Sequence, residues 1–493
     1  MSTLTEILLS AEERFSYRTA VIEDGVSVTY GDLARISRGF ASFLSSRGIK
    51  KGDRVAIFLP NSIEFVTAVF GASLAGAVSV PVNSTFKTEE VAFYLEHSGA
   101  RLIVTSDELE HTASGASSGK GVKVVSIKGE GAGWKFHGQL AGKDFDALAA
   151  GPEDEAVYLY STGSTGKPKR VARTHYNLSA LADNHTQTVG WTCEDRILFA
   201  VPISHTYAFG NFISAVKSGA TVVVSREFNR NRVLDLLERE RITVFPAVPV
   251  MLDVLSKTHL AEPGDFTSLK LVISAGAPLQ ERTFFKFHER FSVYPRQLYG
   301  STETGVISIN LCGEDEIETR RSSVGRPVKN VIVKVFGEDG FEVAAGMTGE
   351  IAVKSPSMTT GYYGLPEETA RVFRDGYYFT GDLGFIDEAG YIYIKGRKKF
   401  LINVGGFKVD PEEVESLLSR HPDVVEAAVL GITDNLGNER VKAVIVARRP
   451  MDVKDVLDFL KDRIAGYKLP ALVEFRPELP RSPAGKILRE RLK

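Results

Sequence analysis

Cysteine is scarce in this chain of 493 residues, which contains only Cys193 and Cys312. The two lie far apart in the sequence without the spacing of metal ligands, so a disulfide framework is excluded and we expect both to fill core positions. An excess of charge of either sign is also missing, because 60 Lys and Arg residues face 62 Asp and Glu residues. This balance gives no support to nucleic acid or an anionic membrane as a partner. We therefore expect small-molecule ligands and a reducing compartment.

Long apolar runs are nearly absent as well. The one candidate, residues 65–82, is uncharged, but Thr67, Gly71, Ser73 and Pro81 interrupt it. This composition favours a buried helix followed by a strand over a membrane span. The N-terminus lacks a basic flank followed by an apolar core, so no signal peptide is predicted. We expect a cytoplasmic protein without integral membrane association.

Short β-branched runs alternate with helical stretches along most of the chain, which predicts layered α/β structure. After about residue 320 the texture changes to antiparallel strands and tight turns, as in a small β-rich unit. The Gly-, Ser- and Lys-rich segment 115–133 is predicted to be an exposed loop or irregular hairpin. The clearest strand candidates are residues 54–59, 102–104, 221–224 and 271–273, and the clearest helices are residues 232–241 and 279–290.

From Gly396 onward the chain has a layout of its own, which predicts a compact α+β domain. A helix is expected to start at Pro411, which suits a first helical turn, and the glutamates after it suit the positive end of the helix dipole. Strands are expected at 426–430 and 441–447 and a helix at 453–464. We place the domain boundary at Arg397, which gives domains 1–396 and 397–493.

Small hydroxyl residues, glycines and two lysines crowd into residues 160–169, Tyr-Ser-Thr-Gly-Ser-Thr-Gly-Lys-Pro-Lys. Glycines let backbone N–H groups turn toward an anion, and hydroxyl and ammonium groups add donors and charge. The common P-loop pattern fails here, because Ser161 replaces its first glycine and Pro168 replaces the hydroxyl that holds magnesium. The apolar run 156–160 is predicted to be a buried strand that presents this loop. We expect the loop to bind the phosphates of ATP.

Four further clusters combine types of side chain that suit a nucleotide. Residues 299–303, Tyr-Gly-Ser-Thr-Glu, offer a ring for adenine, a hydroxyl for phosphate and a carboxylate for Mg²⁺. Residues 378–382 end in Asp382, which can accept hydrogen bonds from ribose or cap a turn. Residues 396–399, Gly-Arg-Lys-Lys, open the last domain, and residues 483–486 place a lone lysine in a flexible setting.

These five motifs, in this order and spacing, resemble those of the acyl-adenylate-forming superfamily. Its members include acyl-CoA and aryl-CoA synthetases, adenylation domains of peptide synthetases and beetle luciferases, and the resemblance spans nearly the whole chain. It implies an α/β multidomain fold: a large N-terminal domain of two α/β subdomains plus a β-barrel-like subdomain, and a small mobile α+β C-terminal domain. The predicted boundary falls at the family hinge.

The resemblance also implies a role for each matching residue. Four residues match catalytic positions of the family. Lys486 matches the lysine that contacts the carboxylate and the α-phosphate, and Thr302 matches the residue that contacts the α-phosphate. Glu303 matches the magnesium ligand, and His205 matches a gate at the acid pocket. Lys399 matches the hinge, and Gly405 and Gly406 match the pantetheine channel. Other residues match the ATP-binding positions of the family. The residues that match contacts to the outer phosphates are Thr162, Ser164, Thr165 and Lys169. Those that match contacts to adenine are Gly276, Ala277, Pro278 and Tyr299, and those that match contacts to ribose are Asp382 and Arg397.

The implied activity is ATP-dependent activation of a carboxylic acid to acyl-AMP with release of pyrophosphate, followed by transfer to the thiol of CoA. Loading of a phosphopantetheinyl carrier protein is the alternative, and Lys486 argues against a non-catalytic nucleotide-binding protein. Thr206 stands where amino-acid-activating relatives place an aspartate, so an amino acid substrate is disfavoured. Aryl and fatty acids both stay open. The expected pocket residues are Thr206, Phe209, Phe212, Val248, Pro249 and Ala275.

Two positions depart from the family pattern at the phosphate loop, and one of them, Thr162, replaces a frequent serine. Arg170 stands where glycine commonly follows. We expect its side chain to be solvated.

Overall fold

The computed structural model describes residues 2–127, 145, 147–148, 150–162, 168–258, 264–400, 402–404, 407–433, 439–461, 463–464, 466–482 and 485–493. Contacts divide the chain into two compact units, Met1–Ile332 with Lys354–Tyr378, and Val333–Val353 with Phe379–Lys493. The second unit includes all of the predicted domain 397–493 together with two segments that precede it. The two compact units thus differ from the predicted domains 1–396 and 397–493, and the expectation that residues 397–493 move as a domain stays a prediction.

The first unit contains a six-stranded sheet in the order β6-β5-β3-β4-β7-β8. Its strands are parallel except for the antiparallel edge pair β7 and β8. Near-continuous apolar runs are expected of parallel strands that are covered on both faces. The bounds are β3 Arg54–Phe58, β4 Val78–Pro81, β5 Ala100–Ser106, β6 Lys123–Ile127, β7 Glu155–Thr162 and β8 Pro168–Thr174.

A nine-stranded sheet in the order β15-β14-β13-β12-β11-β9-β10-β1-β2 also belongs to the first unit. The six central strands β13, β12, β11, β9, β10 and β1 are parallel to their neighbours. At one edge β2 pairs antiparallel with β1, and at the other β14 and β15 pair antiparallel with their neighbours. The bounds are β1 Thr19–Glu23, β2 Val26–Thr29, β9 Arg196–Phe199, β10 Thr221–Val224, β11 Val244–Ala247, β12 Leu271–Ser274, β13 Pro295–Ser301, β14 Gly305–Ile309 and β15 Arg326–Pro327. All four predicted strands and the expected strand 156–160 are confirmed in the two sheets.

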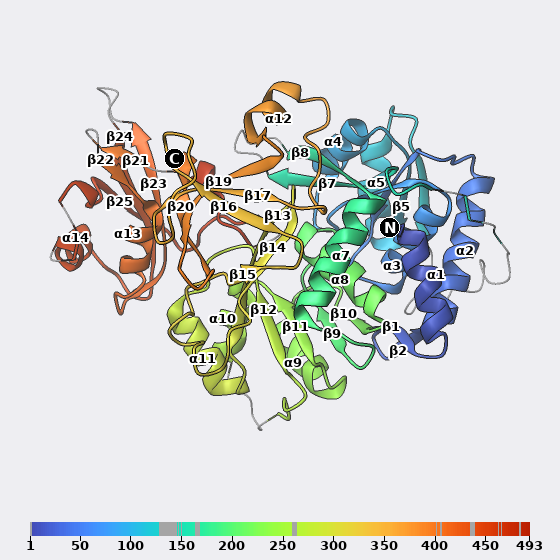
Figure 1. Ribbon diagram of the computed structural model, residues 1–493, viewed down its shortest axis with the longest axis horizontal. Helices are drawn as coiled ribbons and strands as arrows, with labels where there is room; N and C mark the ends of the chain where they lie inside the picture. The colour runs from blue at the N-terminus through green and yellow to red at the C-terminus, as the bar shows by residue number, and fades with distance from the viewer. Residues whose placement is uncertain are drawn as a thin grey trace. The chain divides into compact units, whose positions relative to one another are not determined.

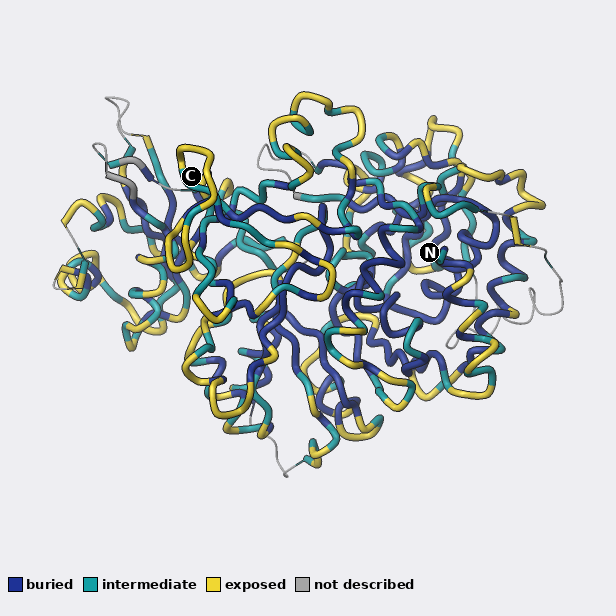
Figure 2. Tube along the Cα trace, in the orientation of Figure 1, coloured by how far each residue is buried: buried dark blue, intermediate teal, exposed yellow. Residues whose placement is uncertain are grey.

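A layer of helices packs against both sheets, as Figure 1 shows. Helix α3, which begins after the N-cap Ser62, is buried along its whole length and contacts strands of both sheets. The predicted buried helix and strand at 65–82 are thus confirmed. In Figure 2, dark blue marks the buried residues of the layer and of the sheets beside it. The helices of the layer are α1 Leu4–Phe15, α2 Tyr30–Ser46, α3 Ile63–Leu74, α7 His175–Val189 and α8 Thr206–Ser218.

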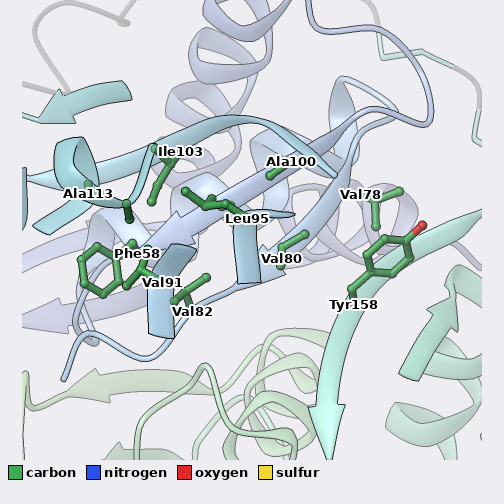
Figure 3. Packing of buried hydrophobic residues seen from close by; sticks show 12 residues of the cluster. Phe58, Val78, Val80, Val82, Val91, Leu95, Ala100, Ile103, Ala113 and Tyr158 are labelled. Atoms are coloured by element: carbon green, nitrogen blue, oxygen red, sulfur yellow. The ribbon is translucent and has the colours of Figure 1, made fainter. Parts of the chain in front are cut away.

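Further helices cover the outer faces of the two sheets. Phe58 and Tyr158, from the six-stranded sheet, pack with Val91 and Leu95 of one such helix in the cluster that Figure 3 shows. The predicted helices 232–241 and 279–290 are confirmed with small shifts of their ends. The outer helices are α4 Thr88–Ser98, α5 Glu110–Ser117, α9 Arg230–Arg239, α10 Pro249–Lys257 and α11 Glu281–Phe291.

The predicted β-rich part is a five-stranded sheet in the order β16-β17-β19-β18, with β20 paired to β19. Its expected turns close with hydrogen bonds from the Gly340 amide to the Gly337 carbonyl and from the Gly390 amide to the Asp387 carbonyl. The bounds are β16 Ile332–Phe336, β17 Gly349–Lys354, β18 Phe373–Arg374, β19 Tyr377–Ile386 and β20 Ile392–Arg397, with α12 Pro366–Val372 before β18.

The C-terminal part of the second unit is α+β, as predicted. A three-stranded sheet β23-β24-β25 and a two-stranded sheet β21-β22 share a core with two helices. The helix at Pro411 is confirmed, with Asp410 as its N-cap. The bounds are β21 Ile402–Val404, β22 Phe407–Val409, α13 Pro411–Leu418, β23 Val424–Thr433, β24 Glu439–Ala447, α14 Val453–Lys461 and β25 Leu472–Phe475.

Two local predictions are wrong. Segment 115–133 is no simple loop where it is described, because residues up to Ser117 end α5 and residues 123–127 form β6, a parallel strand beside β5. The second concerns Cys193, which is partly exposed, whereas Cys312 is buried as expected. In the part of the chain that the model describes, no helix has the length and apolarity to cross a bilayer.

Stability should depend on the ionisation of His185 in α7. Its ring lies 4.6 Å from that of Trp191, and neither ring nitrogen has a hydrogen-bond partner among the described residues. Burial lowers the pKa of His185 to about 4. The unfolded chain binds the proton below about pH 6.5, so the free energy of unfolding should fall by about 3 kcal/mol as pH drops from 6.5 to 4. Urea unfolding of His185→Phe should show a decrease that is smaller by this amount, because the buried His175, whose pKa is also lowered to about 4, keeps its own contribution. The exposed His111→Phe should keep the whole decrease. Equal pH slopes in wild type and His185→Phe would show that the decrease has another source.

Candidate functional site

The predicted phosphate loop connects β7 to β8, two antiparallel strands at the edge of the six-stranded sheet. Thr162 ends β7, while Ser164 and Thr165 lie outside the described residues. Lys169 is the second residue of β8 and pairs with Ser161 across the hairpin. The strand register therefore fixes the backbone at Lys169, the last residue of the predicted loop.

The Lys169 side chain is buried although it carries a charge. Its ammonium group forms an ion pair with Glu368 of α12 and lies 4.8 Å from the centroid of the Tyr362 ring. A buried ammonium needs such partners, because desolvation of an unpaired charge is costly. The cation is thereby held at a defined place beside the phosphate loop.

The predicted residues Thr302 and Glu303 lie on a tight turn between β13 and β14. The turn closes through Gly305, whose φ of +76° is left-handed and favours glycine. A Cβ on Gly305 would also meet the Leu181 side chain at 2.4 Å. The Thr206 hydroxyl of α8 donates to the Thr302 hydroxyl over 3.3 Å, so these two predicted residues are neighbours.

Glu303 is buried, and its carboxylate oxygen Oε1 accepts a hydrogen bond of 2.8 Å from the Tyr362 hydroxyl. Tyr362 therefore contacts both the Glu303 carboxylate and the Lys169 ammonium. No group of three or more possible metal-ligating side chains occurs within the described residues. Mg²⁺ needs no such group, because it is commonly bound by one or two carboxylates together with substrate phosphates and water. A single buried carboxylate that is linked through Tyr362 to Lys169 of the predicted phosphate loop fits that ion.

Arg173 of β8 belongs to this group of residues, although the sequence analysis did not predict it. Arg173 is fully buried and donates to the Thr302 carbonyl over 2.9 Å and to the Ser357 carbonyl. Burial lowers the pKa of the Arg173 guanidinium to about 10, an effect that the Glu303 carboxylate opposes. The group thus remains charged at neutral pH. Only the period of two along the strand, which puts Arg173 on the same face as Lys169, could have indicated this placement.

The prediction that Arg170 is solvated is wrong. Arg170 is buried and donates to the His97 carbonyl over 3.0 Å, while its guanidinium lies 3.2 Å from the centroid of the Tyr363 ring. The guanidinium also lies 4.7 Å from the centroid of a second ring, that of Tyr158. Arginine is more weakly hydrated than lysine and stacks on aromatic faces, which explains why burial is tolerated here.

The expected gate residue His205 caps the N-terminus of α8, where its Nδ1 accepts from the Tyr207 amide over 3.3 Å. Tyr207 in turn donates from its hydroxyl to the Ile273 carbonyl of β12 over 3.0 Å. The start of α8 is therefore fixed to the carboxyl end of a parallel strand, which is where ligands bind in open α/β sheets.

The remaining predicted residues of the first unit fall into two groups by exposure. Phe209, Phe212, Val248 and Ala275 are buried, and Phe212 meets Phe70 of α3 edge-on with ring centroids 5.6 Å apart. The other group is at least partly accessible, and it consists of Pro249, Gly276, Ala277, Pro278 and Tyr299. Gly276, Ala277 and Pro278 follow β12 after one intervening residue, Ala275. Their roles at the acid and the adenine stay predictions.

In the second unit, Asp382 of β19 and Arg397 of β20 are cross-strand partners. The Arg397 Nε lies 2.6 Å from Oδ1 of Asp382, which is buried while the arginine is partly exposed. Both predicted ribose-binding side chains are thus adjacent. Lys486 is half-buried, and its backbone carbonyl accepts from the Ser482 amide over 2.7 Å. The Lys399 side chain and Gly405 and Gly406 lie outside the described residues.

The arrangement within each unit suits a nucleotide. Lys169, Thr302, Glu303 and Thr206 form one connected group in the first unit, through Tyr362 and Arg173. Asp382 and Arg397 form another group in the second unit. Cations and a carboxylate beside a hydroxyl-rich loop can bind a triphosphate with its metal, and a paired Asp–Arg can bind a diol.

Comparisons with known proteins agree with this chemistry. The family model for AMP-binding enzymes matches residues 9–363, and that for the AMP-binding enzyme C-terminal domain matches residues 413–486. A long-chain-fatty-acid–CoA ligase of Mycobacterium tuberculosis is 32% identical over 475 residues, covering 94% of this chain and 92% of the relative. A fatty acid–acyl-carrier-protein ligase of Streptomyces coeruleorubidus is 33% identical over 487 residues, covering 96% and 92%.

A solved structure extends the comparison to a bound nucleotide. The o-succinylbenzoate coenzyme A synthetase from Bacillus subtilis, in complex with ATP and magnesium ion, has a TM-score of 0.87 to this chain at 29% identity. The alignment covers 99% of this chain and 98% of that one. The two chains share a mixed α/β fold with a large N-terminal and a smaller C-terminal domain, which is the fold that the sequence of this chain predicts. The chain belongs to the AMP-binding enzyme family.

Proposed function

We propose that this enzyme activates an aryl or fatty carboxylic acid with ATP and transfers the acyl group to the thiol of CoA. Formation of an acyl-AMP followed by a thioester is the chemistry of its family. The single observation that supports the proposal best is the group in which Tyr362 contacts both Lys169 and Glu303. This group places a cation and a buried carboxylate beside the phosphate loop, as a reaction at a triphosphate requires.

The reaction joins two anions, so its barrier is largely electrostatic and positional. The acid carboxylate attacks the α-phosphorus, the bond to the β-phosphate oxygen breaks, and pyrophosphate leaves with the electron pair. Lys169 would bind the outer phosphates, Thr302 would donate to the α-phosphate, and Lys486 would approach both the carboxylate and the α-phosphate. Mg²⁺ on Glu303, when bound, neutralises phosphate oxygens. No side-chain nucleophile is needed.

The substrate class follows from charge. Thr206 carries no carboxylate for an α-ammonium group, and the buried residues of the expected pocket are apolar. The Mycobacterium relative is named for a long-chain fatty acid and the Bacillus structure for o-succinylbenzoate, both acids without an amino group. Because the Streptomyces relative is named for an acyl-carrier protein, a carrier thiol is the second candidate acceptor.

A panel of aryl and fatty acids, assayed for AMP release with and without CoA, tests the proposal. We expect acid-dependent AMP formation that turns over only when CoA is present. If a purified carrier protein takes the acyl group and CoA does not, the acceptor is a carrier. If no acid of the panel gives AMP or exchanges pyrophosphate, the proposed reaction is wrong.

Lys486→Ala should lose adenylation activity, because the ammonium group would act on charge that develops in the transition state. We expect a loss of about 3 to 4 kcal/mol, which is two to three orders of magnitude in rate. Acid-dependent pyrophosphate exchange measures this step directly. The exposed Lys454→Ala serves as the control and should exchange at the wild-type rate. Near-normal exchange in Lys486→Ala would rule out the assigned role.

Lys399→Pro should separate the two half-reactions. In this proposal the domain 397–493 rotates about Lys399 after adenylation, and Gly405 and Gly406 then line the path of the pantetheine thiol. Proline fixes φ near −65° and so removes the backbone change that a hinge must make. We expect nearly intact pyrophosphate exchange with strongly reduced thioester formation, and Lys399→Ala should retain both. Equal loss of both half-reactions in Lys399→Pro would contradict a hinge at this residue.

A further inference from the structure

A segment that the sequence analysis did not consider, residues 355–363, lies between β8 and the Thr302–Glu303 turn. We call it the linking segment. On the β8 side, the Thr359 hydroxyl donates to the Ala172 carbonyl over 2.7 Å, and the Tyr363 amide donates to the Arg170 carbonyl over 3.2 Å. This segment therefore runs beside the strand that carries Lys169.

The other side of the linking segment holds the turn. The Thr359 amide donates to the Glu303 carbonyl over 2.8 Å, and the Ser357 hydroxyl donates to the Thr304 carbonyl over 2.7 Å. The Asn177 side chain of α7 donates to the carbonyls of Pro356 and Met358, so a helix also holds the linking segment. These bonds hold the backbone of the turn, but none of them reaches the Glu303 carboxylate.

Tyr362 makes that missing contact. Its hydroxyl donates to Oε1 of Glu303 over 2.8 Å, and its ring lies under the Lys169 ammonium at 4.8 Å and meets the Phe373 ring edge-on. Burial, followed by the charge of Glu303, raises the pKa of Tyr362 above its usual value. The hydroxyl therefore stays protonated at neutral pH and acts as a donor. A carboxylate with one oxygen fixed in this way presents its second oxygen in a defined direction.

We propose that Tyr362 is a positioning residue, whose hydroxyl orients the Glu303 carboxylate for the metal that accompanies ATP. The inference rests on the proposed function, because it takes Glu303 as the metal ligand. Hydrogen bonds from groups around a ligating carboxylate orient it and commonly change metal affinity 10- to 100-fold when removed. The ring has a separate task, since it contacts Lys169 and packs on Phe373 whether or not the hydroxyl is present.

Tyr362→Phe isolates the hydroxyl, because phenylalanine keeps the ring beside Lys169. Mn²⁺ serves as the probe, and its binding to the full-length enzyme with a non-hydrolysable ATP analogue is followed by electron paramagnetic resonance. We expect the apparent Kd of Mn²⁺ to rise about tenfold. Binding of the analogue in EDTA should stay unchanged, because the hydroxyl acts on the metal ligand and the ring beside Lys169 remains. Tyr363→Phe is the matched control, because Tyr363 is the next residue along the chain and its ring is exposed and stacks on Arg170. This variant should bind Mn²⁺ like the wild type.

Three results would overturn the inference. The first is an unchanged Mn²⁺ affinity in Tyr362→Phe. The second is an equal weakening of Mn²⁺ and metal-free analogue binding, and the third is the same loss in Tyr363→Phe; either would indicate a general structural effect. A wild-type enzyme that binds neither the analogue nor Mn²⁺ would instead contradict the proposed function itself, so the two failures are distinguishable.

Discussion

The buried guanidinium of Arg173 is the constraint on which the site depends. A charge without access to water must be surrounded by acceptors, and Arg173 has the carbonyls of Thr302 and Ser357 together with the nearby charge of Glu303. The strand that follows the phosphate loop, the turn with Glu303 and the linking segment cannot separate without exposing this charge or leaving it unpaired. The backbone of the turn is thereby fixed relative to Lys169.

This constraint suits the chemistry of the family. A reaction between a carboxylate and a triphosphate gains most from charges that are in place before the reaction, because reorganisation of charges during the reaction adds to the barrier. Three charged groups of the first unit have such partners: Lys169 has Glu368, Glu303 has Tyr362, and Arg173 has two carbonyls. These partners offset part of the cost of burying the charges, and they hold the groups in place as the proposed binding of phosphate and metal requires.

The sequence predicts elements well where one physical signal dominates. The uncharged run 65–82 gives α3 and β4, because its composition suits burial on all sides, and Thr221–Val224 is β10 without a shift of either end. Segment 115–133 misled because its glycines and serines suggested a loop, while tertiary pairing with β5 makes a strand of residues 123–127. Composition alone does not report such pairing.

For the site, the sequence predicts groups whose chemistry is evident in isolation, such as Lys169, Glu303 and Asp382, and their roles stay predictions. It missed Arg173 and Tyr362, and it placed Arg170 in solvent. These residues matter through contacts with segments more than 50 positions away in the chain, such as the bond from Arg170 to His97 and that from Arg173 to Thr302. A single sequence does not contain the distances on which those contacts depend.

The central claim is that the group formed by Lys169, Tyr362 and Glu303 receives the triphosphate of ATP and its metal. A crystal structure of the enzyme with ATP and Mg²⁺ tests this claim most directly. The account predicts the metal on the Glu303 carboxylate, with Tyr362 on its other oxygen, and the outer phosphates beside Lys169. A nucleotide bound away from Thr302 and Glu303, or a metal held by other carboxylates, would contradict it.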